Sequence, residues 1–211
     1  MKVTISLILA NILIFIFTWS SLKYYIENYG FKPKSFLEGK YYLALTSIFL
    51  HANEYHLGLN VLALFFLGSA LEREIGSFRY LLVYFLGGIF ANFIMLLPFL
   101  YSPESIGVGA SGAISALVGA GTFLCPGRLT IFPFSIPLPF VVVGALYFLI
   151  NASNLFTQSV IGYPVHVAGM LIGSIFGLKW SKNWKKGLTL FILTLVFILS
   201  LPYLLKILGF E

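Results

Sequence analysis

The chain of 211 residues contains no aspartate, a single cysteine and few charged side chains of any kind. Charged residues make up 9% of the sequence and hydrophobic residues 59%, whereas soluble domains carry about a quarter charged residues. So few polar groups do not cover the surface of a protein of this size in water. We therefore expect most of the surface to face lipid.

The missing residues also exclude several kinds of chemistry. Because Cys125 is the lone cysteine, the chain forms neither an internal disulfide nor a site built from several cysteines. Without aspartate it builds neither a Ser-His-Asp triad nor the paired aspartates of an aspartyl protease. The zinc protease motif His-Glu-x-x-His is absent. Three histidines are a conceivable zinc site, but Asn60 and Ser111 would then have no role, so we expect no metal or cofactor.

Basic residues outnumber acidic ones, giving a net charge of +6 and an isoelectric point of about 9.4. They are scattered between apolar runs, so they do not form the continuous basic surface that follows a phosphate backbone. We expect no nucleic-acid partner. Their pattern instead indicates topogenic charge and contact with the anionic headgroups of a lipid bilayer.

Seven apolar runs are long enough to cross a bilayer, for which about 20 residues are needed. They lie at about 3–19, 52–71, 78–99, 109–125, 138–157, 164–180 and 187–208. These runs predict an all-α polytopic membrane protein whose residues 1–211 form a single membrane domain. The first run is too long for a signal peptide and is expected to be a retained span.

Lysine and arginine give the expected orientation of the spans. With the N-terminus in the cytoplasm, eight of these residues lie inside and five outside, as the positive-inside rule favours. We therefore expect a multi-pass protein of the cell membrane with a cytoplasmic N-terminus. The stretch 20–50 is rich in Tyr, Lys and Phe, contains Pro33, and is expected to lie partly in the membrane interface.

The first group of polar residues within the apolar runs is His51, His56 and Asn60. His56 and Asn60 are four residues apart, so on a helix they lie about 40° from each other on one face. Both side chains can donate hydrogen bonds to a single point. His51 is expected on the loop that enters the helix. The alternative is an interfacial histidine beside an asparagine that joins two helices.

The second group is the small-residue stretch around Ser111, at the start of the fourth run. A serine at a helix N-terminus lies beside free backbone N–H groups, which stabilise negative charge. Gly109 and Gly112 allow another backbone to come close. The stretch is not the Gly-x-Ser-x-Gly elbow of soluble hydrolases, because residue 113 is alanine. The alternative is close helix packing without chemistry.

The third group is His166 together with Gly169, Gly173 and Gly177. Glycines that recur every four residues give a flat strip on which another helix packs closely. Gly173 and His166 are seven residues apart and share this face. The strip therefore brings His166 close to a neighbouring helix, although a buried structural histidine is the alternative.

All three groups fall toward the outer side of their spans under this orientation. A serine hydroxyl attacks only when a base removes its proton, and a neutral histidine does this. The pattern predicts Ser111 as nucleophile and His166 as general base. His56, Asn60 and the Ser111 backbone N–H are the predicted donors to the oxyanion.

No carboxylate is expected beside the predicted base. Glu54 is expected on the outer loop and Glu72 at the cytoplasmic end of its span, a membrane thickness from His166. We therefore predict a Ser-His dyad, in which rigid packing on the glycine strip replaces part of the effect of an orienting carboxylate.

Together these motifs resemble the rhomboid family of intramembrane serine proteases, over about residues 44–180. The likeness rests on His51-x4-His56-x3-Asn60, Gly109-Ala-Ser111-Gly112, His166-x2-Gly169-x3-Gly173 and Leu71-Glu72-Arg73-Glu74-Ile75-Gly76-Ser77. The resemblance implies a six-helix core, about 1–181, and an extra C-terminal transmembrane helix at about 187–208. It implies a serine endopeptidase that cleaves transmembrane protein substrates near the outer leaflet. It also implies that Glu72 is a structural tether and that residues 151–163 form a cap over the site.

The sequence departs from the family pattern at two places. Tyr42-Leu43 stands where the family often has Trp-Arg, and Ser115 stands where a tyrosine often stacks on the catalytic histidine. Two other functions remain open: a catalytically inactive rhomboid-like binding protein, and a small transporter with a histidine proton relay. The transporter predicts intramembrane charge pairs or helices broken in matched halves, and neither is found in the sequence.

Overall fold

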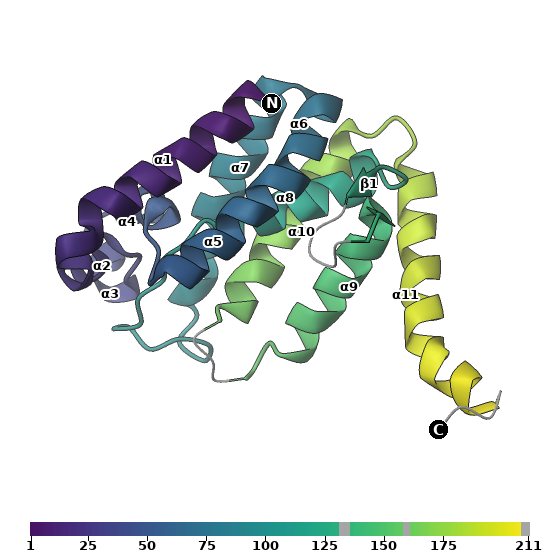
Figure 1. The fold of residues 1–211 in the computed structure, drawn as a ribbon. Coiled ribbons are helices and arrows are strands. Elements are labelled where there is room, and N and C mark those ends of the chain that lie inside the picture. The colour runs from purple at the N-terminus through teal and green to yellow at the C-terminus, as the bar shows by residue number, and fades with distance from the viewer. Residues whose placement is uncertain (131–135, 158–160, 208–211) are drawn as a thin grey trace.

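A computed structural model describes residues 1–130, 136–157 and 161–207, with side chains described as far as residue 201. Almost all of its elements are helices (Figure 1). The principal helices are α1 (Lys2–Thr18), α2 (Leu22–Tyr29), α3 (Pro33–Leu37), α4 (Leu43–Thr46), α5 (Glu54–Ala63), α6 (Ser69–Ile75), α7 (Ser77–Asn92), α8 (Ser111–Leu124), α9 (Phe140–Ser153), α10 (Tyr163–Trp180) and α11 (Trp184–Ile207). Two short strands, β1 (Leu129–Thr130) and β2 (Leu138–Pro139), pair antiparallel. The prediction of an all-α membrane protein is confirmed.

Four helical stretches in the described part of the chain are long and apolar enough to cross a membrane. They are Lys2–Tyr29, Glu54–Ile75, Ser77–Leu96 and Trp184–Leu201, and two shorter apolar helices are Ser111–Leu124 and Phe140–Ser153. The chain is an integral membrane protein. Each of the seven predicted runs contains a helix, although several of the predicted ends were wrong by a few residues.

The second predicted run is one such case, since it continues to Ile75 and is not a uniform α-helix. It begins at Glu54 because the Asn53 side chain accepts a hydrogen bond of 2.8 Å from the His56 backbone N–H, a typical N-terminal cap. A π-helical turn over Leu64–Gly68 joins α5 to α6. The turn separates the half of the span that carries His56 from the half that carries Glu72.

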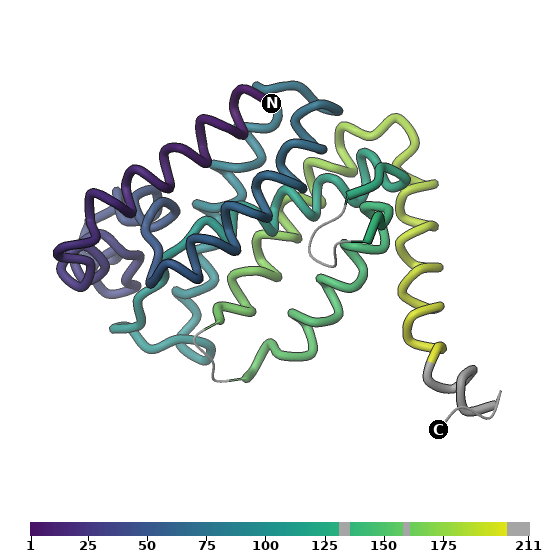
Figure 2. The backbone as a smooth tube through the Cα atoms, viewed as in Figure 1, coloured from purple at the N-terminus to yellow at the C-terminus, as the bar shows by residue number. Residues whose placement is uncertain are grey.

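Helix α8 lies inside the bundle. Its side chains are buried from Gly112 to Phe123, with α7, α9 and α10 packed against it (Figures 1 and 2). Helix α11 lies at the edge of the bundle, beside α9 (Figure 2), and only 6% of its apolar stretch is buried. Whether α11 is an extra helix added to a core of about residues 1–181 stays a prediction.

Glycines allow α8 and α10 to touch through their backbones. A side chain at Gly173 would overlap the Ala116 carbonyl oxygen, and a Cβ at Gly177 would come within 2.8 Å of the Ala120 carbonyl oxygen. Gly169 and Gly112 form a third close contact, and the two residues of each of these three pairs are separated by the same number of positions in the sequence. Because steps of four residues match in the same direction, the two helices run parallel. Their N-terminal ends therefore lie side by side.

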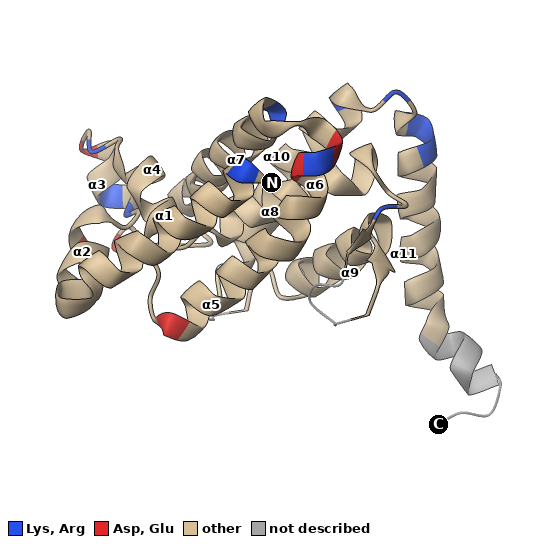
Figure 3. Cartoon of the chain, turned by 45° about the horizontal axis from the view of Figure 1, so that its top comes forward, with Lys and Arg blue, Asp and Glu red and all other residues tan. Residues whose placement is uncertain are grey.

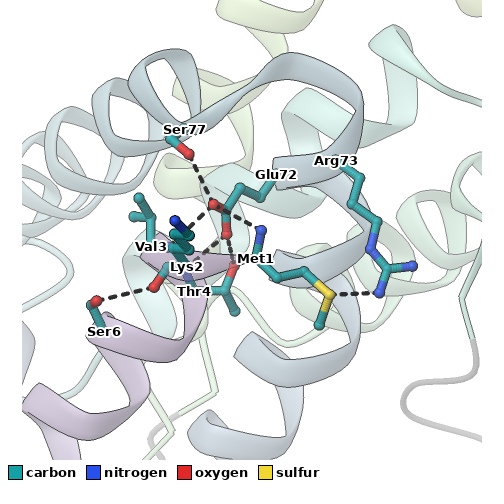
Figure 4. A network of polar contacts seen from close by, with 8 residues as sticks. All are labelled: Met1, Lys2, Val3, Thr4, Ser6, Glu72, Arg73 and Ser77. Carbon is teal, nitrogen blue, oxygen red and sulfur yellow. Dashed lines mark hydrogen bonds and ion pairs between the residues drawn. The ribbon is translucent and has the colours of Figure 1, made fainter.

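The carboxylate of Glu72 on α6 holds the start of α1 (Figure 4). It accepts hydrogen bonds from the backbone N–H groups of Val3 (3.2 Å) and Thr4 (2.9 Å), and from the hydroxyl groups of Thr4 (2.7 Å) and Ser77 (2.9 Å). These backbone donors have no partner within α1, and a negative charge at a helix N-terminus is favourable. Glu72 thus ties α1 and α7 to α6 and is the tether that the resemblance implied.

The loop that precedes α8 is joined to the segment between α2 and α3. Phe31 and Gly107 exchange two backbone hydrogen bonds of 2.8 and 2.9 Å, and Glu104 forms ion pairs with Lys32 (3.4 Å) and Lys34 (3.0 Å). The pairing fixes the approach of the chain to Gly109. Whether residues 20–50 lie in the membrane interface stays a prediction.

One group of basic side chains lies at the opposite end of the bundle from this loop, while Lys32 and Lys34 lie beside the loop itself. Figure 3 shows Lys and Arg on α6, on α7 and around the start of α11. These residues include Arg73, Arg79, Lys182, Lys185 and Lys186. This is the distribution from which we predicted a cytoplasmic face.

Candidate active site

The hydroxyl group of Ser111 lies 2.9 Å from Nε2 of His166. Ser111 is the first residue of α8, and His166 lies in the first turn of α10. Each side chain is partly buried. The two residues are 55 positions apart in the sequence. The contact depends on the parallel backbone packing of α8 and α10 along the glycine strip.

The imidazole of His56 lies against Gly109, two residues before Ser111. A Cβ at Gly109 would come within 2.6 Å of Cε1 and 2.7 Å of Nε2 of His56. Gly109 also has a φ of +118°, a conformation that side chains rarely allow. Glycine at this position therefore lets the His56 ring approach the start of α8. A matching observation holds at Gly112, where Ala91 and Val165 leave little room for a side chain.

Asn60 lies one helical turn after His56 and is 5% exposed. Its Nδ2 donates a hydrogen bond of 2.8 Å to the His56 carbonyl oxygen, while its Oδ1 is buried without a hydrogen-bond partner among the described residues. The prediction that His56 and Asn60 share one face of a helix is confirmed. One of the two amide hydrogens of Asn60 is engaged in this bond.

His51 lies on the loop before α5, as predicted, and is fully buried. Its ring centroid is 5.1 Å from that of His56, in an edge-to-face arrangement. His51 therefore supports the position of the His56 ring, and its own ring is shielded from solvent.

Tyr147 of α9 occupies the space that Ser115 leaves beside His166. The Tyr147 hydroxyl is 2.7 Å from the Ser115 Oγ, and that Oγ donates a 2.6 Å hydrogen bond to the Ser111 carbonyl oxygen. Because Ser115 donates its proton to the carbonyl, Tyr147 is the donor in the first contact. The Tyr147 and His166 rings are 6.1 Å apart with an interplanar angle of 37°. The aromatic neighbour of His166 thus comes from α9 instead of α8.

Asn151 is the residue that reasoning from the sequence missed. Its Oδ1 lies 2.9 Å from Nδ1 of His166, and its Nδ2 donates a 2.7 Å hydrogen bond to the Tyr147 carbonyl oxygen. The cap was expected to begin at Asn151, but this residue lies in the last turn of α9 and is buried. The predicted cap also includes 158–160, outside the described residues. The available signal was Tyr147 and Asn151, two polar residues spaced by four within an apolar run.

The two glutamates that we weighed as partners of His166 are occupied elsewhere. Glu54 is the first residue of α5 and is exposed, and Glu72 is bound at the start of α1. In the described part of the chain, no three His, Cys, Asp or Glu residues come together as a metal site would require. The side-chain groups that meet at the N-terminal end of α8 are a hydroxyl group, imidazoles and amides.

Known proteins are similar to this chain over the segment that carries these motifs. The family model described as Rhomboid domain matches residues 38–183. Rhomboid protease GluP of Bacillus subtilis is 35% identical over 149 residues, which cover 70% of this chain and 28% of the relative. RHOMBOID-like protein 12, mitochondrial, of Arabidopsis thaliana is 27% identical over 203 residues, covering 87% and 59%. Rhomboid protease AarA of Providencia stuartii is 28% identical over 163 residues, covering 68% and 57%.

The chain thus spans 28% and 59% of the lengths of the first two relatives. The match to the family model includes Ser111, His166, both residues of the His56–Asn60 pair and the Glu72 tether. It extends through the whole of α10. This chain belongs to the rhomboid family.

Proposed function

We propose that the protein is an intramembrane serine endopeptidase that cleaves transmembrane protein substrates by a Ser111–His166 dyad. The observation that carries the proposal is the 2.9 Å contact between Ser111 Oγ and His166 Nε2. A contact of this length lets the imidazole accept the hydroxyl proton as the oxygen attacks. The position of Ser111 as the first residue of α8 supplies the electrostatic environment for that attack.

The reaction follows from these positions. Ser111 Oγ attacks the scissile carbonyl carbon, and its proton passes to Nε2 of His166. His166 then gives this proton to the leaving amine as the peptide bond breaks. A water molecule, deprotonated by the same Nε2, hydrolyses the acyl-enzyme and restores the serine.

The tetrahedral intermediate carries a negative oxygen that needs hydrogen-bond donors. The Ser111 backbone N–H is free at the start of α8, because the first N–H groups of a helix have no partner within it. The His56 ring and the second amide hydrogen of Asn60 are the other donors that we propose. Both lie on α5.

The position of the site across the membrane supports a proposal for the class of substrate. Ser111 and His166 lie at the N-terminal ends of their helices, far from the basic end of the bundle. With that basic end in the cytoplasm, the site faces the outer leaflet. A stable helix hides its carbonyl groups, so we propose transmembrane substrates with small or helix-breaking residues near the cleavage point.

The test is labelling of the purified protein in detergent by a fluorophosphonate, which reacts with activated serines. The matched variants are Ser111→Ala and Ser153→Ala, the latter at a serine in the last turn of α9. Labelling of the wild type and of Ser153→Ala, but not of Ser111→Ala, is expected. A folded wild type that is neither labelled nor able to cleave any transmembrane substrate would favour the inactive rhomboid-like protein.

A further inference from the structure

We propose that Asn151 is a positioning residue, which fixes the tautomer and the plane of the His166 ring and so takes the place of the missing aspartate. The inference rests on the proposed function, because it concerns the base of the same reaction. It comes from the contacts of one buried amide between α9 and α10.

The first step concerns the direction in which the Asn151 amide points. Its two ends contact the Tyr147 carbonyl oxygen at 2.7 Å and Nδ1 of His166 at 2.9 Å. A backbone carbonyl oxygen only accepts hydrogen bonds. The NH₂ end must therefore face Tyr147, and Oδ1 must face the imidazole.

The second step concerns the proton on the imidazole. Oδ1 is only an acceptor, so Nδ1 of His166 must carry a hydrogen and donate it. In a neutral ring, Nε2 is then the nitrogen with a free lone pair. That lone pair faces Ser111 Oγ at 2.9 Å. The Tyr147 carbonyl thus selects, through Asn151, the only neutral tautomer in which His166 acts as a base toward Ser111.

The third step concerns charge. Asn151 is 4% exposed, in a chain whose surroundings are apolar. A carboxylate at this place would carry a large desolvation cost in the resting enzyme, whereas the amide is neutral. When His166 takes the serine proton, its Nδ1–H still donates to Oδ1, so the ring keeps its orientation during the reaction.

Asn154 provides a matched control directly after the same helix. Its Nδ2 donates a 2.8 Å hydrogen bond to the Ile150 carbonyl oxygen, four residues earlier, as Asn151 does to Tyr147. Asn154 follows the last residue of α9. Asn154→Leu therefore removes the same kind of helix contact without changing the surroundings of His166.

The decisive measurement is the ¹⁵N spectrum of histidine-labelled protein, which reports the tautomer of each ring. The chain has three histidines, and His166→Gln assigns the signal of interest. We expect Nδ1–H in the wild type, in Ser111→Ala and in Asn154→Leu, and a mixture of tautomers in Asn151→Leu. An Nε2–H ring in the wild type, or a spectrum unchanged in Asn151→Leu, would overturn the inference.

Kinetics with a transmembrane substrate gives the second readout. Asn151→Leu should lower kcat by roughly 10- to 100-fold, by analogy with the range for partners that orient metal-binding histidines, with KM within about twofold. Asn151→Asp keeps an acceptor oxygen toward Nδ1, but it loses the donor to the Tyr147 carbonyl and adds the desolvation cost of a carboxylate, so it should recover only part of kcat. Unchanged kcat in Asn151→Leu overturns the positioning role. A wild type without turnover counts against the proposed function instead, and the tautomer is still decided by the spectrum.

Discussion

Gly173 of α10 lies so close to the carbonyl oxygen of Ala116 on α8 that no side chain fits between them. The same contact is repeated one turn toward the site by Gly169 and Gly112. Each glycine removes the layer of side chains that normally separates two helices. The distance between the helix axes, and with it the reach of His166 to Ser111, is therefore set by backbone atoms.

Gly173→Ala is expected to separate α8 from α10, because the new methyl group would overlap the Ala116 carbonyl. We expect a loss of stability of about 1–3 kcal/mol, the usual cost of overpacking, and a larger fractional loss of turnover. Gly58→Ala is the control, since a Cβ added to Gly58 on α5 would meet no atom within 4 Å. Thermal unfolding in detergent and substrate cleavage measure both effects. Equal behaviour of the two variants would contradict the role of the strip.

Glu72→Ala should destabilise the protein without touching the site. The side chain is 2% exposed, and its loss would leave the donors at Val3 and Thr4 without an acceptor. We expect about 2–4 kcal/mol, since hydrogen bonds to charged groups are strong and removing one partner of a buried network leaves the others unpaired. The measurement is the unfolding midpoint in detergent.

Glu74→Ala is the matched control for Glu72→Ala. Glu74 is two residues further along α6 and pairs with Arg128 at 3.0 Å, but both side chains are exposed. Surface ion pairs contribute about 0–1 kcal/mol. A Glu74 variant as unstable as the Glu72 variant would show that the tether is not what holds α1.

The Tyr147–Ser115 contact predicts a double-mutant cycle with a measurable coupling. Tyr147→Phe leaves Ser115 bonded to the Ser111 carbonyl, so we expect a loss of only about 0.5–1.5 kcal/mol. Ser115→Ala removes two hydrogen bonds and leaves the Tyr147 hydroxyl unpaired. The double variant should be more stable than the sum of the single losses predicts, by about 0.5–1.5 kcal/mol. Additive losses in chemical or thermal unfolding would contradict the contact.

Asn60→Ala should slow turnover by about 10- to 1,000-fold, the usual scale for one oxyanion donor. Its effect should appear in kcat, because the oxyanion forms only during the reaction. The fluorophosphonate label at Ser111 should form more slowly but still form. A rate equal to that of the wild type would remove Asn60 from the proposed mechanism.

The sequence was most informative where spacing alone determined geometry. Glycines at every fourth position predicted the strip on α10, and the separation of His56 and Asn60 by four predicted their shared face. Apolar runs predicted the membrane helices because burial in lipid imposes a minimum length. Such features are local, so they are readable without knowing which helices are neighbours.

The partners of His166 were not readable in this way. Asn151 and Tyr147 act through contacts with α10 and α8, and the sequence did not indicate how α9 is rotated against those helices. Ser115 was named from the sequence as a departure from the family pattern. That a tyrosine from another helix fills the space became visible only when the three helices were placed together.

The π-helical turn at Leu64–Gly68 has a consequence for how this gene tolerates insertions and deletions. A π turn holds one more residue than an α turn of similar length. Removal of a single residue there would restore a regular helix and leave the segments on either side facing as they do, whereas removal of a residue from an α-helical turn would rotate everything beyond it by roughly 100°. Asn60 and Glu72 would then keep their neighbours, so a one-codon deletion within Leu64–Gly68 is expected to be less damaging than a one-codon deletion in α5 or α6.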